Sequence, residues 1–249
     1  MALREWQAAL GQLVEARASG RELEPLLRSL DGLDLSETER AWLRKVVGTP
    51  GFELTCYVPR WWRTTRISRS ARLTLGALGP ARQQVLQAYL RATPCTTLFF
   101  ASEGLLFLEY ILSSSQEPHV RSLAQFEHAL WTLKREGLGA PAPTTREPKP
   151  EELLAPSQGA AIVTFEASAE ELLSAVLTGA PLPQAAEPHP VLIAPGLPHM
   201  WRPATAGEAR AFQACTPPAP VGTVEALPDV GPEVLASLLS AGALVLRQP

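Results

Sequence analysis

Hydrophobic residues in the first half of the chain recur at intervals of three and four, which is the spacing of one face of an α-helix. The clearest sets are Leu3, Trp6, Leu10 and Leu13; Trp42, Leu43, Val46 and Val47; and Val85, Leu86, Tyr89 and Leu90. Residues 98–112 are apolar on nearly every side, as expected of a helix in the middle of a bundle. The pattern therefore predicts a helical N-terminal domain.

Capping residues indicate where several of these helices begin. Ser36 and Glu39 have the spacing of a capping box, in which each side chain accepts a hydrogen bond from the backbone N–H of the other residue. Ser122 and Gln125 repeat that spacing before another amphipathic stretch, so a last helix is expected to begin there. Pro80 suits the first turn of a helix, because the N–H that proline lacks would have no partner in that turn.

Short apolar segments replace the helical pattern in the last third of the chain. Residues 160–165 (AAIVTF) and 190–195 (PVLIAP) are expected to be buried strands, and the helix between them ends at Gly179. Residues 232–246 predict a helix and a closing strand, an order that winged-helix domains share. A small α+β domain is expected, and a peptide-binding, winged-helix-like domain is one form that it could take.

A proline-rich segment separates the two patterns. Residues 137–158 contain five prolines and hardly any large apolar side chain, a composition that favours extended, solvated backbone. The prediction for the whole chain is an α+β protein with a helical bundle domain at 1–136, a linker at 137–158 and a small α+β domain at 159–249. With 249 residues, 46% of them hydrophobic, the chain has enough apolar material for two cores.

Charge is distributed unevenly, although the net charge is only -3. Residues 54–102 contain seven arginines and no Asp or Glu, a formal charge of +7. Residues 150–249 contain ten acidic residues and three arginines, a formal charge of -7. The contrast predicts that some of the arginines contact a partner, while others lie against acidic groups elsewhere in the chain.

The densest group of chemically distinctive residues lies inside the basic block, where five arginines at every third position flank two adjacent tryptophans. These residues are Arg60, Trp61, Trp62, Arg63, Arg66, Arg69 and Arg72. A step of three falls about 60° short of a full helical turn, so arginines on a helix would wind around it instead of forming one face. Guanidinium groups bind carboxylates in a bidentate manner and stack on indole rings, which makes the group a candidate partner- or peptide-binding site. The alternative is that a tryptophan is buried and the arginines are solvated or paired within the chain.

The sequence contains no motif that indicates catalysis or a cofactor. The four histidines lack the spacing of a helical metal site, the three cysteines form no C-x-x-C pair, and no phosphate-binding or nucleotide-binding glycine motif is present. We therefore predict no catalytic residue, no metal and no cofactor, although His189 and His199 at the two ends of a predicted strand leave a metal pair open. The longest apolar stretch is too short and too interrupted for a transmembrane helix, and the N-terminus lacks the pattern of a secretory signal, so a cytoplasmic location is expected.

Two runs of the sequence resemble the partner proteins of multinuclear non-heme iron-dependent oxidative enzymes, such as the companion subunit of methanobactin biosynthesis. They are residues 33–78 and 99–133. In the second run, an apolar helix ends near Phe107 and Leu108, a polar turn contains Pro118, and LAQFEHAL follows at 123–130. The arginine series has no counterpart in the motifs of the family, so its part in recognition is inferred from the residues alone.

The resemblance implies a non-catalytic subunit that forms a heterodimer with the iron enzyme, itself a TIM barrel. Such a subunit holds no iron and helps to present a ribosomally made precursor peptide for modification. The leader segment of the precursor could add a strand to an open sheet edge, where main-chain hydrogen bonds give affinity and side-chain pockets give specificity. The strands expected at 161–165 and 191–194 are both candidates for that edge.

Two other functions remain open at this point. In the first, the chain is a DNA-binding transcriptional regulator whose Arg60 to Arg72 block contacts phosphates. A sequence pI of about 5.9 argues against nucleic acid as a partner, because DNA-binding domains are usually strongly basic. In the second, the chain is an enzyme by itself, which would need a cluster of titratable groups in a cleft.

Overall fold

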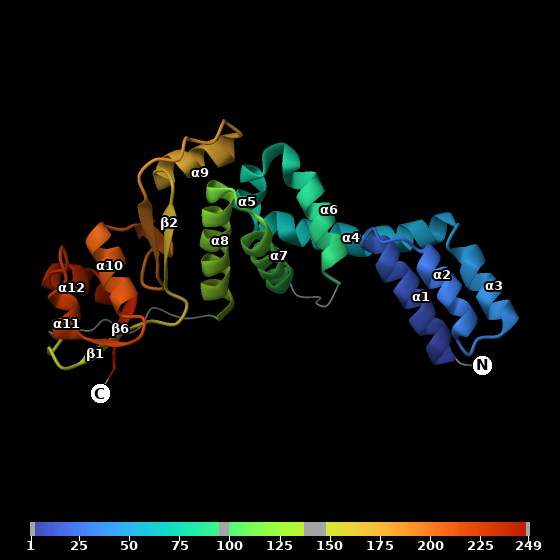
Figure 1. Cartoon of the computed structure of the whole chain (residues 1–249), viewed down its shortest axis with the longest axis horizontal. Coiled ribbons are helices and arrows are strands. Elements are labelled where there is room, and N and C mark those ends of the chain that lie inside the picture. Colours follow the sequence, from blue (N-terminus) through green and yellow to red (C-terminus); the bar gives the residue numbers. More distant parts are fainter. Residues whose placement is uncertain (1–2, 95–99, 137–147, 248–249) are drawn as a thin grey trace. The chain divides into compact units, whose positions relative to one another are not determined.

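The computed structural model of the protein describes residues 3–94, 100–136 and 148–247. Over these residues it combines helices with two three-stranded antiparallel sheets, so the α+β class expected from the sequence is confirmed (Figure 1). The contacts within the chain define two compact units. Unit 1 comprises residues 1–69 and 79–104, and unit 2 comprises residues 70–78 and 105–249.

Every element of unit 1 that the structure describes is helical. The elements are α1 (Leu3–Ala18), α2 (Glu24–Ser29), η1 (Leu30–Gly32), α3 (Glu37–Val46), α4 (Pro50–Ser70, of which Ser70 falls in unit 2), η2 (Gly79–Ala81), α6 (Arg82–Ala92) and the start of α7 (Phe100–Ser114). Leu13, Leu43 and Phe52 are buried in the core where α1, α3 and α4 meet. The helical spacing therefore predicted α1, α3 and α6 correctly. The apolar helix predicted at 98–112 is confirmed from Phe100 onwards, and residues 98 and 99 lie outside the described part of the chain.

The capping box predicted for α3 is present. The backbone N–H of Glu39 donates to the Ser36 hydroxyl (3.3 Å), and the backbone N–H of Ser36 donates to the Glu39 carboxylate (2.9 Å). The two bonds satisfy backbone N–H groups that have no partner within the helix. Pro80 lies in the short η2 turn, immediately before α6.

Unit 2 contains both sheets. Its helices are α5 (Arg72–Ala77), the remainder of α7, α8 (Pro118–Glu136), α9 (Ala169–Thr178), α10 (Ala206–Ala214), α11 (Val221–Glu225) and α12 (Pro232–Ser240). Its strands are β1 (Leu153–Pro156), β2 (Ala161–Phe165), β3 (His189–Ile193), β4 (Trp201–Pro203), β5 (Ala219–Pro220) and β6 (Leu244–Arg247). The strands expected near residues 160–165 and 190–195 are β2 and β3, and the expected closing helix and strand are α12 and β6.

The two sheets have the strand orders β5-β1-β6 and β2-β3-β4, and all their pairs are antiparallel. The closing strand β6 pairs with β1, and Leu246 lies opposite Leu154. In the second sheet β3 is the central strand, and Val191 lies opposite Val163 of β2. The core beside β2 and β3 is completed by α8, whose Phe126 packs edge-on against Phe165 at 5.5 Å between ring centroids.

The last helix of the predicted N-terminal domain begins earlier than expected. α8 starts at Pro118, four residues before the predicted capping residue Ser122. The Ser122 hydroxyl instead donates to the His119 carbonyl within the helix (3.1 Å). Proline suits the first turn of a helix, so the helix extends back to Pro118 and the serine lies inside it.

The structure also differs from the predicted linker at 137–158. Residues 137–147 lie outside the described part of the chain, but Leu153–Pro156 form β1, the central strand of its sheet, and Leu154 is fully buried. Unit 2 includes α8, because the apolar face of β2 and β3 is covered by Phe126 and its neighbours. The division of the chain therefore differs from a boundary that assigns α8 to the N-terminal domain.

In the described parts of the chain, every helix is too short or too polar to cross a bilayer.

Candidate protein-binding surface on α4

One face of α4 is buried in unit 1. Phe52, Cys56, Arg63 and Ile67 follow one another at intervals of four, seven and four, which places them on one face of the helix, and each is at most 4% exposed. Phe52 and Cys56 contribute to the core that α4 shares with α1 and α3. The spacing of the remaining residues places the opposite face of α4 in solvent.

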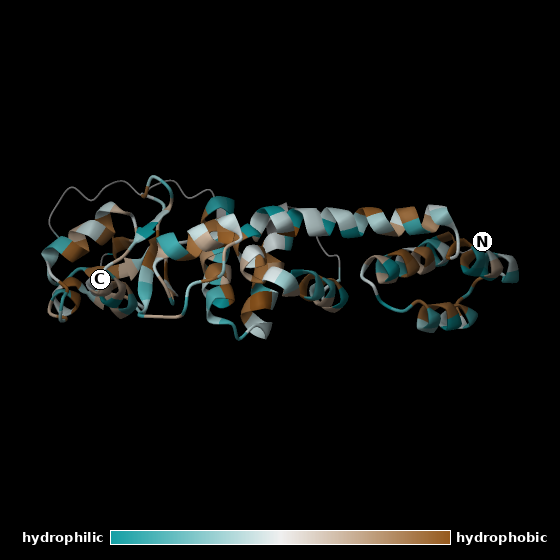
Figure 2. Ribbon diagram, turned by 90° about the horizontal axis from the view of Figure 1, so that it is seen from above, coloured by the Kyte–Doolittle hydropathy of each residue, from teal (hydrophilic) through white to brown (hydrophobic). Residues whose placement is uncertain are grey.

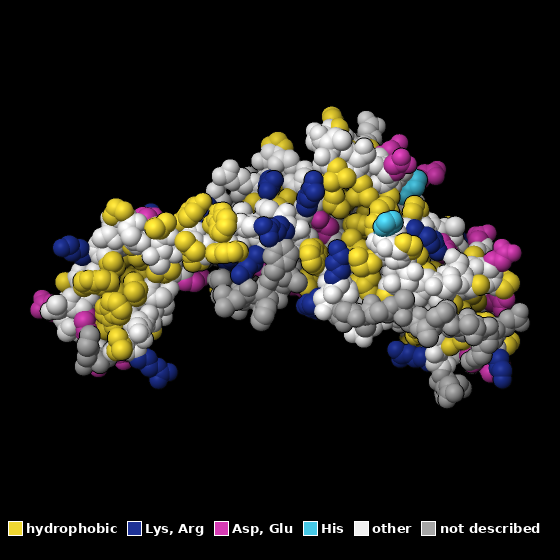
Figure 3. All heavy atoms as spheres, turned by 180° about the vertical axis from the view of Figure 1, so that it is seen from behind, with side chains coloured by type: hydrophobic (Ala, Val, Ile, Leu, Met, Phe, Trp, Pro, Cys, Tyr) yellow, Lys and Arg dark blue, Asp and Glu magenta, His cyan; other side chains and the backbone are white. Residues whose placement is uncertain are grey.

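The opposite face exposes five large apolar side chains, which we call the α4 apolar stripe. These are Leu54, Tyr57, Val58, Trp61 and Trp62, each between 44% and 65% exposed. They occupy positions i, i+3, i+4, i+7 and i+8 of the helix, so they form one continuous strip. Figure 3 shows hydrophobic side chains exposed over α4, and Figure 2 shows hydrophobic residues between more polar ones along the same helix. A contiguous exposed apolar strip of this kind is typical of a protein interaction site.

The arginines of the predicted site are spread around the helix, as the spacing of three requires. The guanidinium of Arg66 lies over the Trp62 ring, 5.8 Å from its centroid, and Trp62 packs edge-on against Trp61 at 5.0 Å. Arg69 is exposed and lies two turns beyond Trp62 on the same side of α4. Arg72 is also exposed, but it begins α5 and belongs to unit 2.

Arg63 differs from the other predicted site residues because it is buried. Its Nε donates to Oε1 of Glu103 in α7 at 2.8 Å, and the Tyr89 hydroxyl donates to the same oxygen at 2.8 Å. Burial, followed by the charge of Glu103, raises the pKa of Tyr89, so the phenol stays protonated. Arg63 therefore holds α4, α6 and α7 together and has no exposed surface for a partner.

Sequence reasoning missed Glu103 as the partner of Arg63. The available signal was that Glu103 is the first acidic residue after the basic block and lies in an otherwise apolar helix. A charge in such a position requires a partner of opposite charge, because an unpaired ion is costly to bury.

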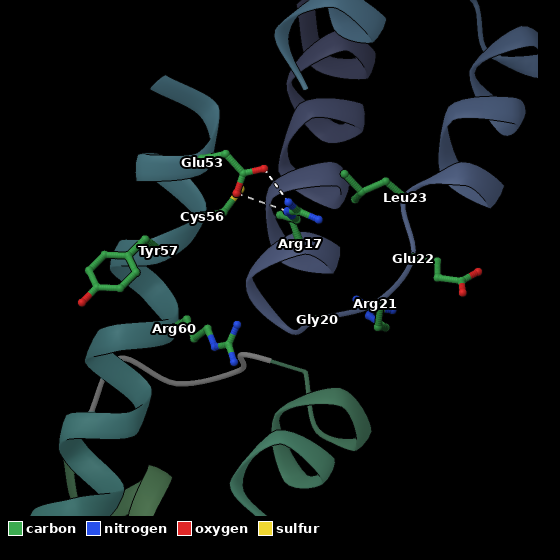
Figure 4. Close-up of a pocket in the computed structure, with 9 residues that line it drawn as sticks. All are labelled: Arg17, Gly20, Arg21, Glu22, Leu23, Glu53, Cys56, Tyr57 and Arg60. Atoms are coloured by element: carbon green, nitrogen blue, oxygen red, sulfur yellow. Dashed lines mark hydrogen bonds and ion pairs between the residues drawn. The ribbon is translucent and has the colours of Figure 1, made fainter. Parts of the chain in front are cut away.

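A depression of about 540 Å³ lies beside α4, at the turn between α1 and α2, and Figure 4 shows the residues that line it. On one side Arg17 binds Glu53 through two hydrogen bonds of 2.6 and 3.3 Å. On the other side Arg60 extends from α4 towards Gly20 in the turn (Figure 4). Cys56 also lines the depression, and burial raises the pKa of its thiol to about 11, so it is not a reactive thiolate at neutral pH.

The described residues contain no group of three His, Cys, Asp or Glu side chains that could hold a metal ion. Burial raises the pKa of Glu127 in α8 to about 7. Its oxygens accept hydrogen bonds from the backbone N–H groups of Leu73 and Thr74 and from the Thr74 hydroxyl. Glu127 therefore fixes the start of α5, a structural role.

The outer edge of β2 is the second candidate contact surface. Of the two strands suggested by the sequence, β3 has neighbours on both sides, whereas β2 lies at the edge. The Pro190 carbonyl accepts a hydrogen bond from the Ala204 N–H, which turns the even-numbered residues of β3 towards β4 and the odd-numbered ones towards β2. The backbone groups of Ile162 and Thr164 therefore point away from β3, and they have no backbone partner in the described part of the chain.

A scan against protein-family models finds no match to the chain, and a search of curated proteins finds none either. The interpretation of the α4 apolar stripe and of the β2 edge therefore rests on their geometry and chemistry.

Proposed function

We propose that the chain is a non-catalytic partner subunit that binds an iron-dependent peptide-modifying enzyme through the α4 apolar stripe and helps to present the precursor peptide. The observation that carries this proposal is the exposure of five large apolar side chains in one strip of a helix whose other face is buried. Covering such a strip removes apolar area from water, which is worth about 25 cal/mol per Å². The resemblance of residues 33–78 and 99–133 to partner proteins of iron enzymes supports the class of partner.

A protein fits this surface better than nucleic acid does. Protein interfaces are enriched in Trp, Tyr and Arg, and the stripe combines Trp61, Trp62 and Tyr57 with Arg66 at its flank. The basic block offers fewer phosphate contacts than its composition suggests, because Arg63 is used inside the protein. This function also assigns the subunit to the cytoplasm, where ribosomes make the precursor.

The β2 edge supports the part of the proposal that concerns the precursor. Strand addition needs backbone N–H and C=O groups that point away from the sheet, and Ile162 and Thr164 provide them. Thr164 is exposed, so a peptide lying beside it would not have to displace a buried side chain.

The experiment measures binding of the full chain to the iron enzyme encoded in a neighbouring reading frame. Trp61→Ala should weaken binding by about 2 kcal/mol or more, because tryptophans at the centre of an interface contribute most of its affinity. Trp42→Ala is the matched control, since Trp42 is 45% exposed but lies on α3, outside the stripe. Normal binding by Trp61→Ala and Trp62→Ala would contradict the proposed interface. Loss of enzyme binding by the unmodified chain between about 50 and 200 mM salt would point instead to an interface held by the exposed arginines, because salt screens contacts between charges.

The same preparation tests the β2 edge with the precursor peptide. Thr164→Pro removes an outward N–H without removing a hydrogen bond to β3, so it should weaken peptide binding and leave enzyme binding unchanged. Thr164→Val keeps the N–H and should bind the peptide normally. Equal peptide binding by the two variants would contradict strand addition at this edge.

A further inference from the structure

Three adjoining depressions in unit 1 share Arg60 as part of their walls. The first, of about 540 Å³, lies at the turn between α1 and α2 (Figure 4). The second, of about 160 Å³, also borders Gly20 and reaches α6 at Gln87, Leu90 and Arg91. The third, of about 500 Å³, lies between α4 and α6 and shares Gln87 and Leu90 with the second. We call the second and third depressions together the Arg60 groove.

Among the residues that the structure describes, the Arg60 groove is lined by three arginines and by no acidic residue, whereas the first depression also contains Glu22 and Glu53. Within the residues that the structure describes, Arg60 and Arg91 make no ion pair, and Arg82 donates only to the Ser68 hydroxyl at 3.3 Å. Three arginines of the acid-free segment 54–102, namely Arg60, Arg82 and Arg91, therefore lie on one concave surface. Guanidinium groups in a concave surface without acidic partners form a site for anionic groups.

The remaining lining indicates which kind of anion fits. Leu86 and Leu90 are buried and give the groove an apolar floor. Gln83 and Gln87 add amide groups, which can donate to and accept from a peptide main chain. Carboxylate side chains alternating with apolar ones would match both the arginines and the leucines.

A nucleic acid strand matches this groove less well. Single-stranded nucleic acid is held by aromatic side chains on which its bases stack, and none of the described residues that line the Arg60 groove is aromatic. Trp61 and Trp62 belong to the stripe on another side of α4. The apolar floor would also remain without a partner if only phosphates were bound.

We propose that the Arg60 groove binds an acidic segment of a peptide, with its carboxylates on Arg60, Arg82 and Arg91 and its apolar side chains on Leu86 and Leu90. Assigning this segment to the precursor rests on the proposed function. The preference of the groove for acidic peptides does not, because it follows from the lining alone.

The test measures fluorescence polarisation with the full chain at about 150 mM salt. The probe is a fluorescein-labelled synthetic peptide of alternating glutamate and leucine. The same peptide with glutamine in place of glutamate is the uncharged comparison, and inorganic phosphate and a single-stranded oligothymidylate are the competitors. The glutamate peptide should bind at least about tenfold more tightly than the glutamine peptide, because each charge-assisted hydrogen bond contributes about a factor of ten or more.

Substitutions place the binding in the groove. Arg60→Ala should weaken binding of the glutamate peptide about tenfold, and Arg60→Ala with Arg91→Ala should weaken it further. Arg28→Ala is the matched control, because Arg28 is an exposed arginine of unit 1 that does not line the groove. Thermal melts check that each variant is folded. If Arg60→Ala unfolds, the test relies on Arg91→Ala, because Arg91 is exposed near the end of α6.

Three results would overturn the proposal. Equal affinity for the two peptides, or unchanged binding by Arg60→Ala and Arg91→Ala, would show that the groove does not bind acidic peptides. Displacement by phosphate or oligothymidylate at lower concentration than by unlabelled peptide would assign the groove to phosphate groups. Two variants keep the two proposals apart. If Arg60→Ala loses binding of the probe peptide but binds the enzyme normally, the groove is supported. The effect of Trp61→Ala on enzyme binding tests only the α4 apolar stripe.

Discussion

At the scale of single residues, one buried carboxylate joins α8 to the start of α5. Glu127 is 6% exposed and accepts three hydrogen bonds of 2.7 to 2.9 Å from Leu73 and Thr74. Those bonds favour the ionised carboxylate, but burial outweighs them and raises the pKa of Glu127 from 4.5 to about 7. The folded protein therefore binds a proton at Glu127 more tightly than the unfolded chain does.

The first prediction follows from that difference in pKa. The stabilisation from protonated Glu127 is fully present below pH 4.5 and is lost as the pH rises through about 7, a change on the order of 3 kcal/mol. Urea denaturation should show that the free energy of unfolding falls as the pH is raised from 4.5 to about 7. Glu127→Gln should flatten this part of the profile, since glutamine does not titrate. A wild-type profile that matches that of the variant would contradict the prediction.

The second prediction concerns the buried pair of Arg63 and Glu103. Arg63→Ala should lower the free energy of unfolding by about 3 to 5 kcal/mol, because it leaves the Glu103 carboxylate buried without its counter-charge. Arg69→Ala on the same helix should change it by less than about 0.5 kcal/mol, since Arg69 is exposed. Chemical denaturation of the two variants measures the difference. Similar stabilities would show that the buried ion pair contributes little.

At the scale of elements, α4 has a buried face that packs in the core and an outer face that is apolar but exposed. Its buried face follows the spacing of a core helix, and its outer face carries the α4 apolar stripe. Pro59 lies inside the helix, where the residue lacks the N–H of a helical hydrogen bond, yet α4 continues to Ser70. The packing of Phe52, Cys56, Arg63 and Ile67 on both sides of Pro59 supports that continuity.

The third prediction concerns the close packing of α5 against α9. A Cβ atom at Gly76 would lie 2.5 Å from Cγ1 of Val176, a branched side chain with little freedom to move. Gly76→Ala should therefore cost about 1 to 3 kcal/mol, and Val176→Ala in the same chain should recover part of that loss. Gly11→Ala in α1 is the control, because nothing lies within 4 Å of its Cβ position and alanine favours the helix. Thermal melts that rank the two alanine variants in the opposite order would contradict this prediction.

At the scale of the whole molecule, unit 2 is assembled from segments far apart in the sequence. The β2 and β3 core needs Leu123, Phe126 and Leu133 of α8. The other sheet needs β1 between β5 and β6. A fragment that begins at residue 159 lacks both contributions.

The fourth prediction is that a fragment of residues 159–249 does not fold cooperatively, although sequence patterns place a domain boundary there. Its exposed β2 and β3 side chains should bind a hydrophobic dye, and its thermal transition should be broad. Cleavage of the full chain between residues 137 and 147 should leave the two pieces associated, because α8 stays packed on the sheet. A sharp transition of the fragment at the temperature of the full chain would contradict the prediction.

The sequence by itself determined the features that depend on neighbours within a few residues. Helical spacing predicted α1, α3 and α6, the Ser36 capping box marked the start of α3, and Gly179 ends α9 with a positive φ of 72°. Short apolar runs likewise predicted β2 and β3. These features are local because a cap or a helical face is satisfied by residues three or four positions away.

Only the tertiary structure decided the features that depend on residues distant in sequence. Nothing near Leu154 indicates a strand, because β1 is stabilised by partners more than sixty residues later. Arg63 and Arg60 look alike in the sequence, yet Arg63 meets Glu103 forty positions away and is buried, whereas Arg60 lines a groove whose described walls contain no acidic residue. The physical reason is that burial and charge pairing are set by which surfaces pack together, and local spacing contains no information about that choice.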